Sequence, residues 1–137
     1  MSLSNSIFLI CGLPNAGKTT FSKQFKTVLH YDDISHLPKK ERDHIILTTD
    51  AECVEGVFNT RANRTWITRN VPHDHKVCIW IDTPVDECIR REKRFRSEFF
   101  IQILNKHFEP PTLDEGWDEI IHIKGDNNGN QNQIGQC

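Results

Sequence analysis

Eight residues near the start of the chain form a pattern that binds phosphate groups. The run from Gly12 to Thr19, GLPNAGKT, fits G-x-x-x-x-G-K-S/T at every fixed position. Its glycines let successive backbone N–H groups point at phosphate oxygens. Lys18 can reach the β- and γ-phosphates, and the Thr19 hydroxyl is the usual ligand of the Mg²⁺ ion that bridges them. The pattern predicts binding of ATP or another nucleoside triphosphate with Mg²⁺. The expected contacts come from Gly12, Asn15, Ala16, Gly17, Lys18, Thr19 and Thr20.

An acidic pair, Asp32-Asp33, follows a short predicted strand near residues 28–31. Open α/β sheets collect their active sites at the carboxyl ends of such strands. A carboxylate there can take the proton from an attacking hydroxyl group, which makes Asp32 a candidate general base. The structural alternative is that Asp33 caps the next helix.

The densest positive run of the chain is RREKRFR, from Arg90 to Arg96. In a phosphoryl-transfer enzyme, arginines at this stage of the fold can close over the triphosphate and stabilise the transition state. Basic residues also complement a helix C-terminus, and the spacing allows the pairs Asp86–Arg90 and Glu87–Arg91. We therefore predict structural roles for Arg90 and Arg91. Arg94, with no acid four residues before it, and Arg96 are the predicted functional arginines.

Two further clusters are weaker candidates. The triplet His73-Asp74-His75 suggests a metal site but lacks companions at ligand spacing. Arginines at 61, 64 and 69 lie on or beside a predicted helix with Trp66, where they would contact nucleic acid or, as we favour, form a solvated helix face.

The elements that must position these residues alternate along the chain. Strands are predicted at 6–11, 28–31, 53–59, 76–82 and 119–124, and helices at 18–28, within 35–52, around 62–69 and as two segments within 84–107. Thr83 is the predicted N-cap of the helix that starts at Pro84. Alternating strands and helices predict a single α/β domain over residues 1–124, with a central parallel sheet and helices on both faces. The two most apolar strands, 6–11 and 76–82, should lie side by side in its centre. Residues 125–137 are predicted to be a disordered polar tail.

Composition limits the classes of function. The 137 residues carry a net charge of −2, which excludes a generally basic nucleic-acid-binding surface. The five cysteines form no C-x-x-C pair, so a disulfide framework or a zinc site is not expected. We find neither a charged leader segment nor an apolar run long enough to span a membrane in this sequence. We therefore expect a cytoplasmic protein.

Three segments resemble the kinase module of the 5′-hydroxyl polynucleotide kinases of phage and animal type. The phosphate-binding loop matches the family's G-x-P-x-x-G-K-S-T, including Pro14, and residues 93–96 resemble the basic lid of the animal enzymes. The most specific segment, from Lys106 to Ile120, is similar to the family's F-E-P-P-T-L-x-E-G-F, with Trp117 in place of the last Phe.

The resemblance implies a P-loop kinase-like fold, ATP and Mg²⁺ as donor and cofactor, and the 5′-hydroxyl end of DNA or RNA as acceptor, as in nucleic acid repair. Asp32 would be the general base, and Arg94 or Arg96 the lid arginine. The chain departs from the family at two positions. Phe58 stands where many members have an acid before Asn-Thr, which predicts that a carboxylate near the acceptor is missing, and Ser35 stands where the phage type has an arginine.

Two other functions fit the same residues. The loop and the lid are common to small-molecule and nucleotide kinases, and a fold does not fix the acceptor. A nucleotide-binding module with weak or no catalysis is the third possibility. The sequence does not identify protein partners.

Overall fold

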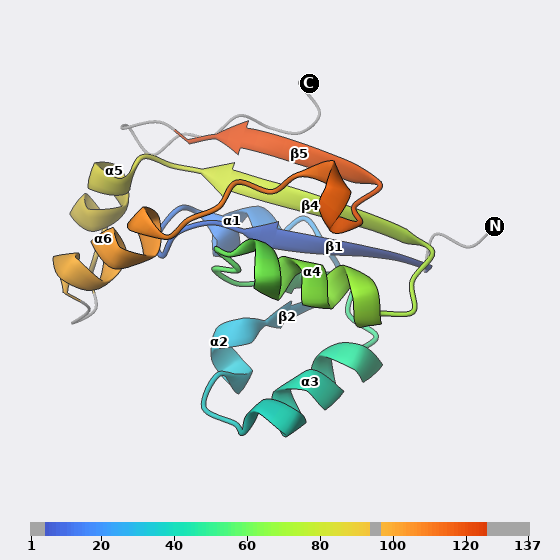
Figure 1. Ribbon diagram of the computed structural model, residues 1–137. Coiled ribbons are helices and arrows are strands. Elements are labelled where there is room, and N and C mark those ends of the chain that lie inside the picture. Colours follow the sequence, from blue (N-terminus) through green and yellow to red (C-terminus); the bar gives the residue numbers. More distant parts are fainter. Residues whose placement is uncertain (1–4, 94–96, 126–137) are drawn as a thin grey trace.

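The computed structural model describes residues 5–93 and 97–125. In this part of the chain, strands form one parallel sheet in the order β2-β3-β1-β4-β5 (Figure 1). The strands are β1 (Ser6–Cys11), β2 (Val28–His30), β3 (Cys53–Glu55), β4 (His75–Asp82) and β5 (Glu119–Lys124). The helices are α1 (Lys18–Ser22), α2 (Tyr31–Ile34), α3 (Lys39–Thr48), α4 (Arg61–Asn70), α5 (Val85–Arg90), α6 (Glu98–Lys106) and the 3₁₀ helix η2 (Leu113–Glu115). The predicted α/β domain with a parallel sheet is confirmed.

Strands β1 and β4 lie side by side at the centre of the sheet, as their apolar sequences predict. Their register runs from Ser6 opposite His75 to Cys11 opposite Trp80. In β1, Leu9, Ile10 and Cys11 are completely buried, although they point alternately to opposite faces. A strand covered on both faces needs apolar residues at consecutive positions, which explains the unbroken run in the sequence.

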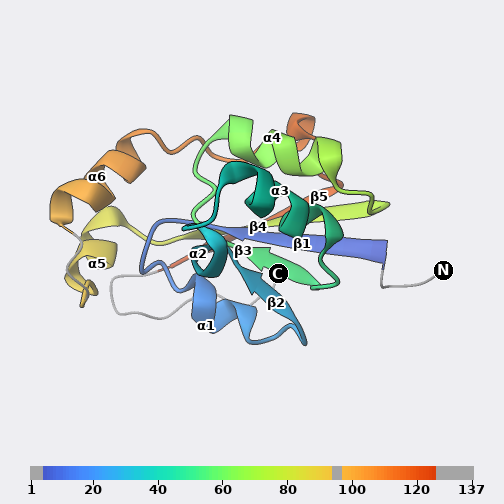
Figure 2. The ribbon, with the colours of Figure 1, turned by 90° about the horizontal axis from the view of Figure 1, so that it is seen from below.

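Helices cover both faces of this sheet. Ile34, Ile46 and Ile67 bring α2, α3 and α4 into one core with Leu9 of β1. Phe21, Cys88 and Ile101 bring α1, α5 and α6 into a second core with Ile10. Figure 2 shows α1 on one side of the sheet and α3 and α4 on the other. None of the helices in the described residues is long and apolar enough to span a membrane.

Several elements differ from the prediction: β2 ends at His30, β4 begins at His75, and α2 lies where no helix was predicted. Three further differences are at the ends of α1, β3 and α5. Helix α1 ends at Ser22, because the next turns use bonds to the third residue back, such as Phe25 N–H to the Ser22 carbonyl at 3.0 Å. Strand β3 ends at Glu55 instead of residue 59, since the chain turns after Gly56 and Phe58 adopts a φ of 36°. Pro84 is the N-cap of α5, so that helix begins one residue later than predicted.

Arg64 is not part of a solvated helix face. Its side chain is completely buried and forms an ion pair with Glu115, with Nε 2.9 Å from Oε1. Arg61, in contrast, pairs at the surface with Asp114 at 2.8 Å. Much of the segment that resembles polynucleotide kinases, from Lys106 to Ile120, therefore contacts α4 and stabilises the fold. Trp117, at its variant position, donates from Nε1 to Glu115 at 3.0 Å.

Candidate active site

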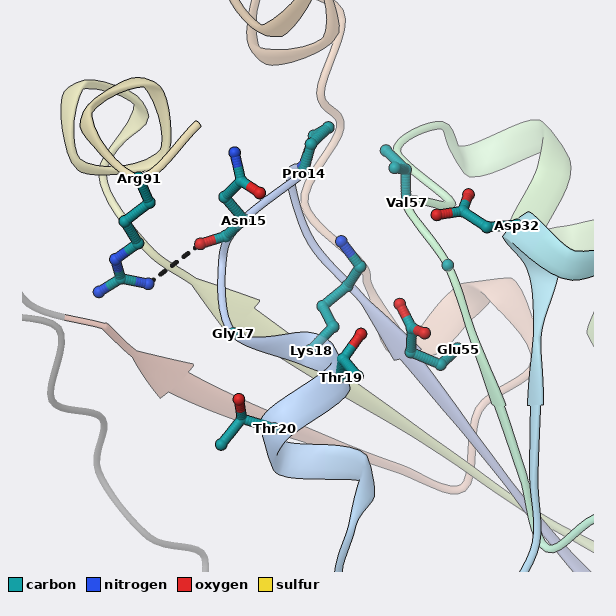
Figure 3. A pocket seen from close by; sticks show the side chains of 11 residues that line it. Pro14, Asn15, Gly17, Lys18, Thr19, Thr20, Asp32, Glu55, Val57 and Arg91 are labelled. Atoms are coloured by element: carbon teal, nitrogen blue, oxygen red, sulfur yellow. Dashed lines mark hydrogen bonds between the residues drawn. The ribbon is translucent and has the colours of Figure 1, made fainter. Parts of the chain in front are cut away.

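The phosphate-binding loop joins β1 to α1 at the carboxyl edge of the sheet. It forms one side of a pocket of about 310 Å³ (Figure 3). The pocket is lined by Pro14, Asn15, Gly17, Lys18, Thr19, Thr20, Asp32, Glu55, Gly56, Val57 and Arg91. Six of the predicted contact and catalytic residues of the loop and α2 thus meet in one place: Asn15, Gly17, Lys18, Thr19, Thr20 and Asp32.

The two glycines of the motif serve different purposes. Gly17 has a φ of 108°, is the N-cap of α1 and lines the pocket, as expected of a residue close to a ligand. Gly12 is not among the lining residues. A Cβ atom there would lie 2.6 Å from the Ile81 carbonyl oxygen, so Gly12 permits close packing of β1 against β4. Ala16 is also buried away from the pocket surface, and its carbonyl accepts a hydrogen bond from Thr83 at 2.7 Å.

Thr83 therefore has a role other than the predicted helix cap. Its hydroxyl supports the loop backbone from the end of β4, and the side chain is buried. Gly125 packs directly on it, because a Cβ atom at Gly125 would lie 2.1 Å from the Thr83 Oγ1 atom. The residues that directly follow β4 and β5 thus support the backbone of the loop.

Lys18 lies at the base of the pocket. Its Nζ atom donates to the Leu13 carbonyl at 2.8 Å, and the residue is only 7% exposed. Burial lowers the pKa of Lys18, while the negative charges of Glu55 and Asp32 oppose that shift. The only charged amine of the loop is therefore held next to the space where a triphosphate would lie.

Two carboxylates line the pocket opposite the loop. Asp32 comes from α2 and Glu55 from the end of β3, and Figure 3 shows both on the same side of Lys18 and Thr19. Asp33 does not cap the helix as the alternative predicted, because it lies within α2, whose N-cap is His30. Asp33 is also absent from the pocket lining. The geometry therefore separates the two neighbouring acids and leaves Asp32 as the one that faces the site.

Glu55 is a carboxylate of the pocket that the sequence analysis did not single out. The predicted strand extended to residue 59, so the acid at its end was sought at position 58. Because β3 ends at Glu55, the carboxylate at the sheet edge lies three residues earlier. His30, its register partner in β2, holds it with Nδ1 2.7 Å from Oε1. The signal in the sequence was the turn residue Gly56, which directly follows Glu55.

Arg91 lines the pocket, although the sequence assigned it a structural role. Its Nε donates to Glu87 at 2.7 Å, and its Nη1 donates to the Asn15 carbonyl at 3.0 Å (Figure 3). Asn15 in turn donates through Nδ2 to the Cys88 carbonyl and to Glu92. Arg91 thus links α5 to the loop and also places a positive charge beside it.

The ion pairs formed by this basic run agree with the prediction only in part. Arg90 pairs with Glu87 at i,i+3 and is largely exposed, which agrees with a structural role but not with the expected Asp86 partner. The expected Glu87–Arg91 pair is present at 2.7 Å. Arg94 and Arg96, the predicted lid arginines, lie outside the described residues, and their roles stay predictions.

The donor set of the pocket fits a magnesium ion bound together with a nucleotide. Mg²⁺ prefers oxygen ligands and is usually held by one or two protein groups and by the phosphates. Among the lining residues, the Thr19 hydroxyl and the carboxylates of Asp32 and Glu55 supply oxygen ligands of this kind. No group of three or more His, Cys, Asp or Glu side chains suited to a metal occurs in the described residues, the His73–His75 triplet included.

Comparison with known proteins identifies the fold. No protein-family model matches the sequence, and no curated protein is significantly similar to it. A gluconokinase from Sinorhizobium meliloti 1021 has a TM-score of 0.60 and 13% identity, over 88% of this chain and 82% of its own. A sugar kinase from Janibacter sp. HTCC2649 has a TM-score of 0.62 and 15% identity, over 90% of this chain and 86% of its own. At such identities the likeness concerns the fold alone, so this chain has the fold of P-loop kinases.

Proposed function

We propose that this protein is an ATP-dependent kinase that transfers the γ-phosphoryl group to a hydroxyl group of a small acceptor molecule. One observation carries the proposal: Lys18, Thr19 and Asp32 line the same pocket. Lys18 supplies a positive charge for the triphosphate, Thr19 supplies a hydroxyl ligand for its metal ion, and Asp32 supplies a base for the acceptor. Mg²⁺ is usually held by one or two protein groups, which Thr19 and Glu55 can supply, so Asp32 is left to act on the acceptor.

We assign each part of the transfer to particular residues of the pocket. Lys18 and the loop N–H groups bind the β- and γ-phosphates, and bound Mg²⁺ would neutralise part of their charge. Asp32 takes the proton of the acceptor hydroxyl while its oxygen attacks the γ-phosphorus. The bond from that phosphorus to the bridging oxygen of ADP breaks, and ADP leaves. Arg91, beside the loop, stabilises negative charge on the transferred group.

The two structural neighbours, a gluconokinase and a sugar kinase, support a small polyhydroxyl acceptor. A specific observation favours a second acceptor, the 5′-hydroxyl end of DNA or RNA, because the segment from Lys106 to Ile120 resembles polynucleotide kinases. The presence of Glu55 in the pocket argues against a binding module that has lost its acceptor carboxylate.

Transfer of labelled γ-phosphate to competing acceptors tests the proposal. Gluconate, a nucleoside, a nucleoside monophosphate and a 5′-hydroxyl oligonucleotide are offered in parallel, with Lys18→Ala as the matched inactive control. Label in at least one acceptor with the wild type and none with Lys18→Ala is the expected result. Release of phosphate to water alone, with no labelled acceptor, would favour a nucleotide-hydrolysing module.

A further inference from the structure

His30 and Glu55 form a contact at the edge of the active-site pocket that the transfer step itself does not use. The two residues are register partners in β2 and β3, and His30 Nδ1 lies 2.7 Å from Glu55 Oε1. A carboxylate can only accept hydrogen bonds, so the ring carries a proton on Nδ1 and donates this bond. The side chain of Glu55 is 10% exposed and that of His30 34%, so the bond is largely shielded from water at its Glu55 end.

The backbone fixes where the Glu55 side chain begins, but not where its carboxylate lies. Strand β3 pairs with β1 on one side and β2 on the other, with Ile10 and His30 opposite Glu55. A glutamate side chain has several rotatable bonds, and holding it in one place costs more conformational entropy than for most residues. Within the described part of the chain, His30 is the one residue that forms a hydrogen bond or ion pair with this side chain. The place of the carboxylate therefore depends on His30.

The second oxygen of Glu55 remains available to the pocket. Oε1 contacts His30, while no hydrogen bond joins Oε2 to any other described residue. Glu55 lines the pocket together with Lys18 and Thr19 (Figure 3). Burial lowers the pKa of Lys18, and the charge of Glu55 is the largest influence that opposes this shift. The free carboxylate oxygen and the Thr19 hydroxyl thus belong to one site, close enough to Lys18 for its charge to be felt there.

From these contacts we infer that His30 is a positioning residue for the metal ion, which holds Glu55 so that Oε2 binds the Mg²⁺ of the nucleotide. Hydrogen bonds to metal ligands orient those ligands, and their loss weakens metal binding. The inference rests on the proposed kinase function and names the contact that sets the metal affinity of its site. The structural alternative is that His30 only ties the three-residue edge strand β2 to β3.

The contribution of the metal ion to nucleotide binding can be measured without turnover. The β,γ-imido analogue of ATP is titrated by calorimetry in Mg²⁺ and in EDTA, and the ratio of the two affinities is the gain due to the metal. His30→Phe keeps a ring but has no donor. His30→Asn places its Nδ2 donor as many bonds from the backbone as the histidine Nδ1, and His30→Gln places its donor one bond farther away. His36 is exposed and does not line the pocket, so His36→Ala is the matched control.

We expect His30→Phe to reduce the gain from Mg²⁺ about ten-fold or more, with a much smaller change of affinity in EDTA. His30→Asn should restore most of the gain and His30→Gln less of it, while His36→Ala leaves the gain unchanged. In a Glu55→Gln background, His30→Phe should have no further effect, because both substitutions act through one carboxylate.

An unchanged gain in His30→Phe, or equal losses in His30→Phe and His30→Asn, would overturn the inference and leave His30 as a link between two strands. A wild type without any gain from Mg²⁺ would overturn it as well. Circular dichroism verifies folding, and if His30→Phe does not fold, the difference between His30→Asn and His30→Gln decides. A gain that depends on His30, without phosphate transfer to any acceptor, would instead refute the proposed kinase function and leave the role of His30 in place.

Discussion

Arg64 and Glu115 face each other in the interior, with Nε 2.9 Å from Oε1 and Nη2 2.9 Å from Oε2. Arg64 also donates from Nη1 to the Phe58 carbonyl at 2.8 Å and from Nη2 to the Glu109 carbonyl. A buried guanidinium is tolerated only when its charge and its donors are satisfied in this way. The pair consequently fixes the loop after β3 and the segment before β5 to the same helix.

Removal of Arg64 should destabilise the whole domain. Arg64→Ala leaves the Glu115 carboxylate buried without its partner, and such losses cost about 3–5 kcal/mol. Urea unfolding monitored by circular dichroism measures the effect. Arg61→Ala, which breaks the exposed pair with Asp114, is the control and should destabilise the protein far less. Similar losses of unfolding free energy in both variants would show that the buried Arg64 pair stabilises the fold no more than the exposed Arg61 pair does.

Lys18→Ala should abolish phosphoryl transfer and weaken triphosphate binding, because no other residue of the loop carries a positive charge. Lys18→Arg should fail as well, since a planar guanidinium does not replace a compact ammonium held in a tight space. Transfer assays and ATP titration check both variants. Full turnover by either variant would show that this loop does not bind the phosphate donor.

Arg91 and Arg90 should differ in their effects on catalysis. Arg91→Ala removes a charge that lines the pocket and a bond to the Asn15 carbonyl, so we expect kcat to fall more than about ten-fold. Arg90→Ala should be nearly silent, because Arg90 contacts Glu87 and does not line the pocket. Steady-state kinetics with ATP compares the two. A larger defect in Arg90→Ala would reverse the assignment.

Acid should weaken the attachment of α5 to the loop. Hydrogen bonds from Arg90 and Arg91 lower the pKa of Glu87 from its ordinary 4.5 to about 2. Because the folded-state pKa is the lower one, this stabilisation is present above pH 4.5 and disappears as the pH falls toward 2. Glu87→Gln should therefore show a smaller loss of urea resistance between pH 5 and pH 3 than the wild type. Parallel pH profiles of the two proteins would contradict this linkage.

Residues with a local signal were predictable, and those defined by distant contacts were not. The phosphate-binding loop and the central strands follow from glycine spacing and unbroken apolar runs, which act within one segment. Burial of Arg64 depends on Glu115, 51 residues away, and nothing in the local sequence distinguishes Arg64 from the exposed Arg61. Glu55 was missed because the end of β3 is set by the turn at Gly56 and the unusual φ of Phe58.

The assignment of Asp32 as the general base is the central claim, and its neighbour supplies the matched control. Asp32→Asn keeps the size of the side chain but cannot accept a proton from the acceptor hydroxyl. Asp33→Asn makes the same chemical change one residue away, outside the pocket.

The decisive measurement is the single-turnover rate of phosphoryl transfer by these two variants, with ATP affinity determined in parallel. We predict that Asp32→Asn lowers the rate about 10²-fold or more with nearly unchanged ATP affinity, while Asp33→Asn stays within a few-fold of the wild type. Equal losses in both variants, or no loss in either, would contradict the account.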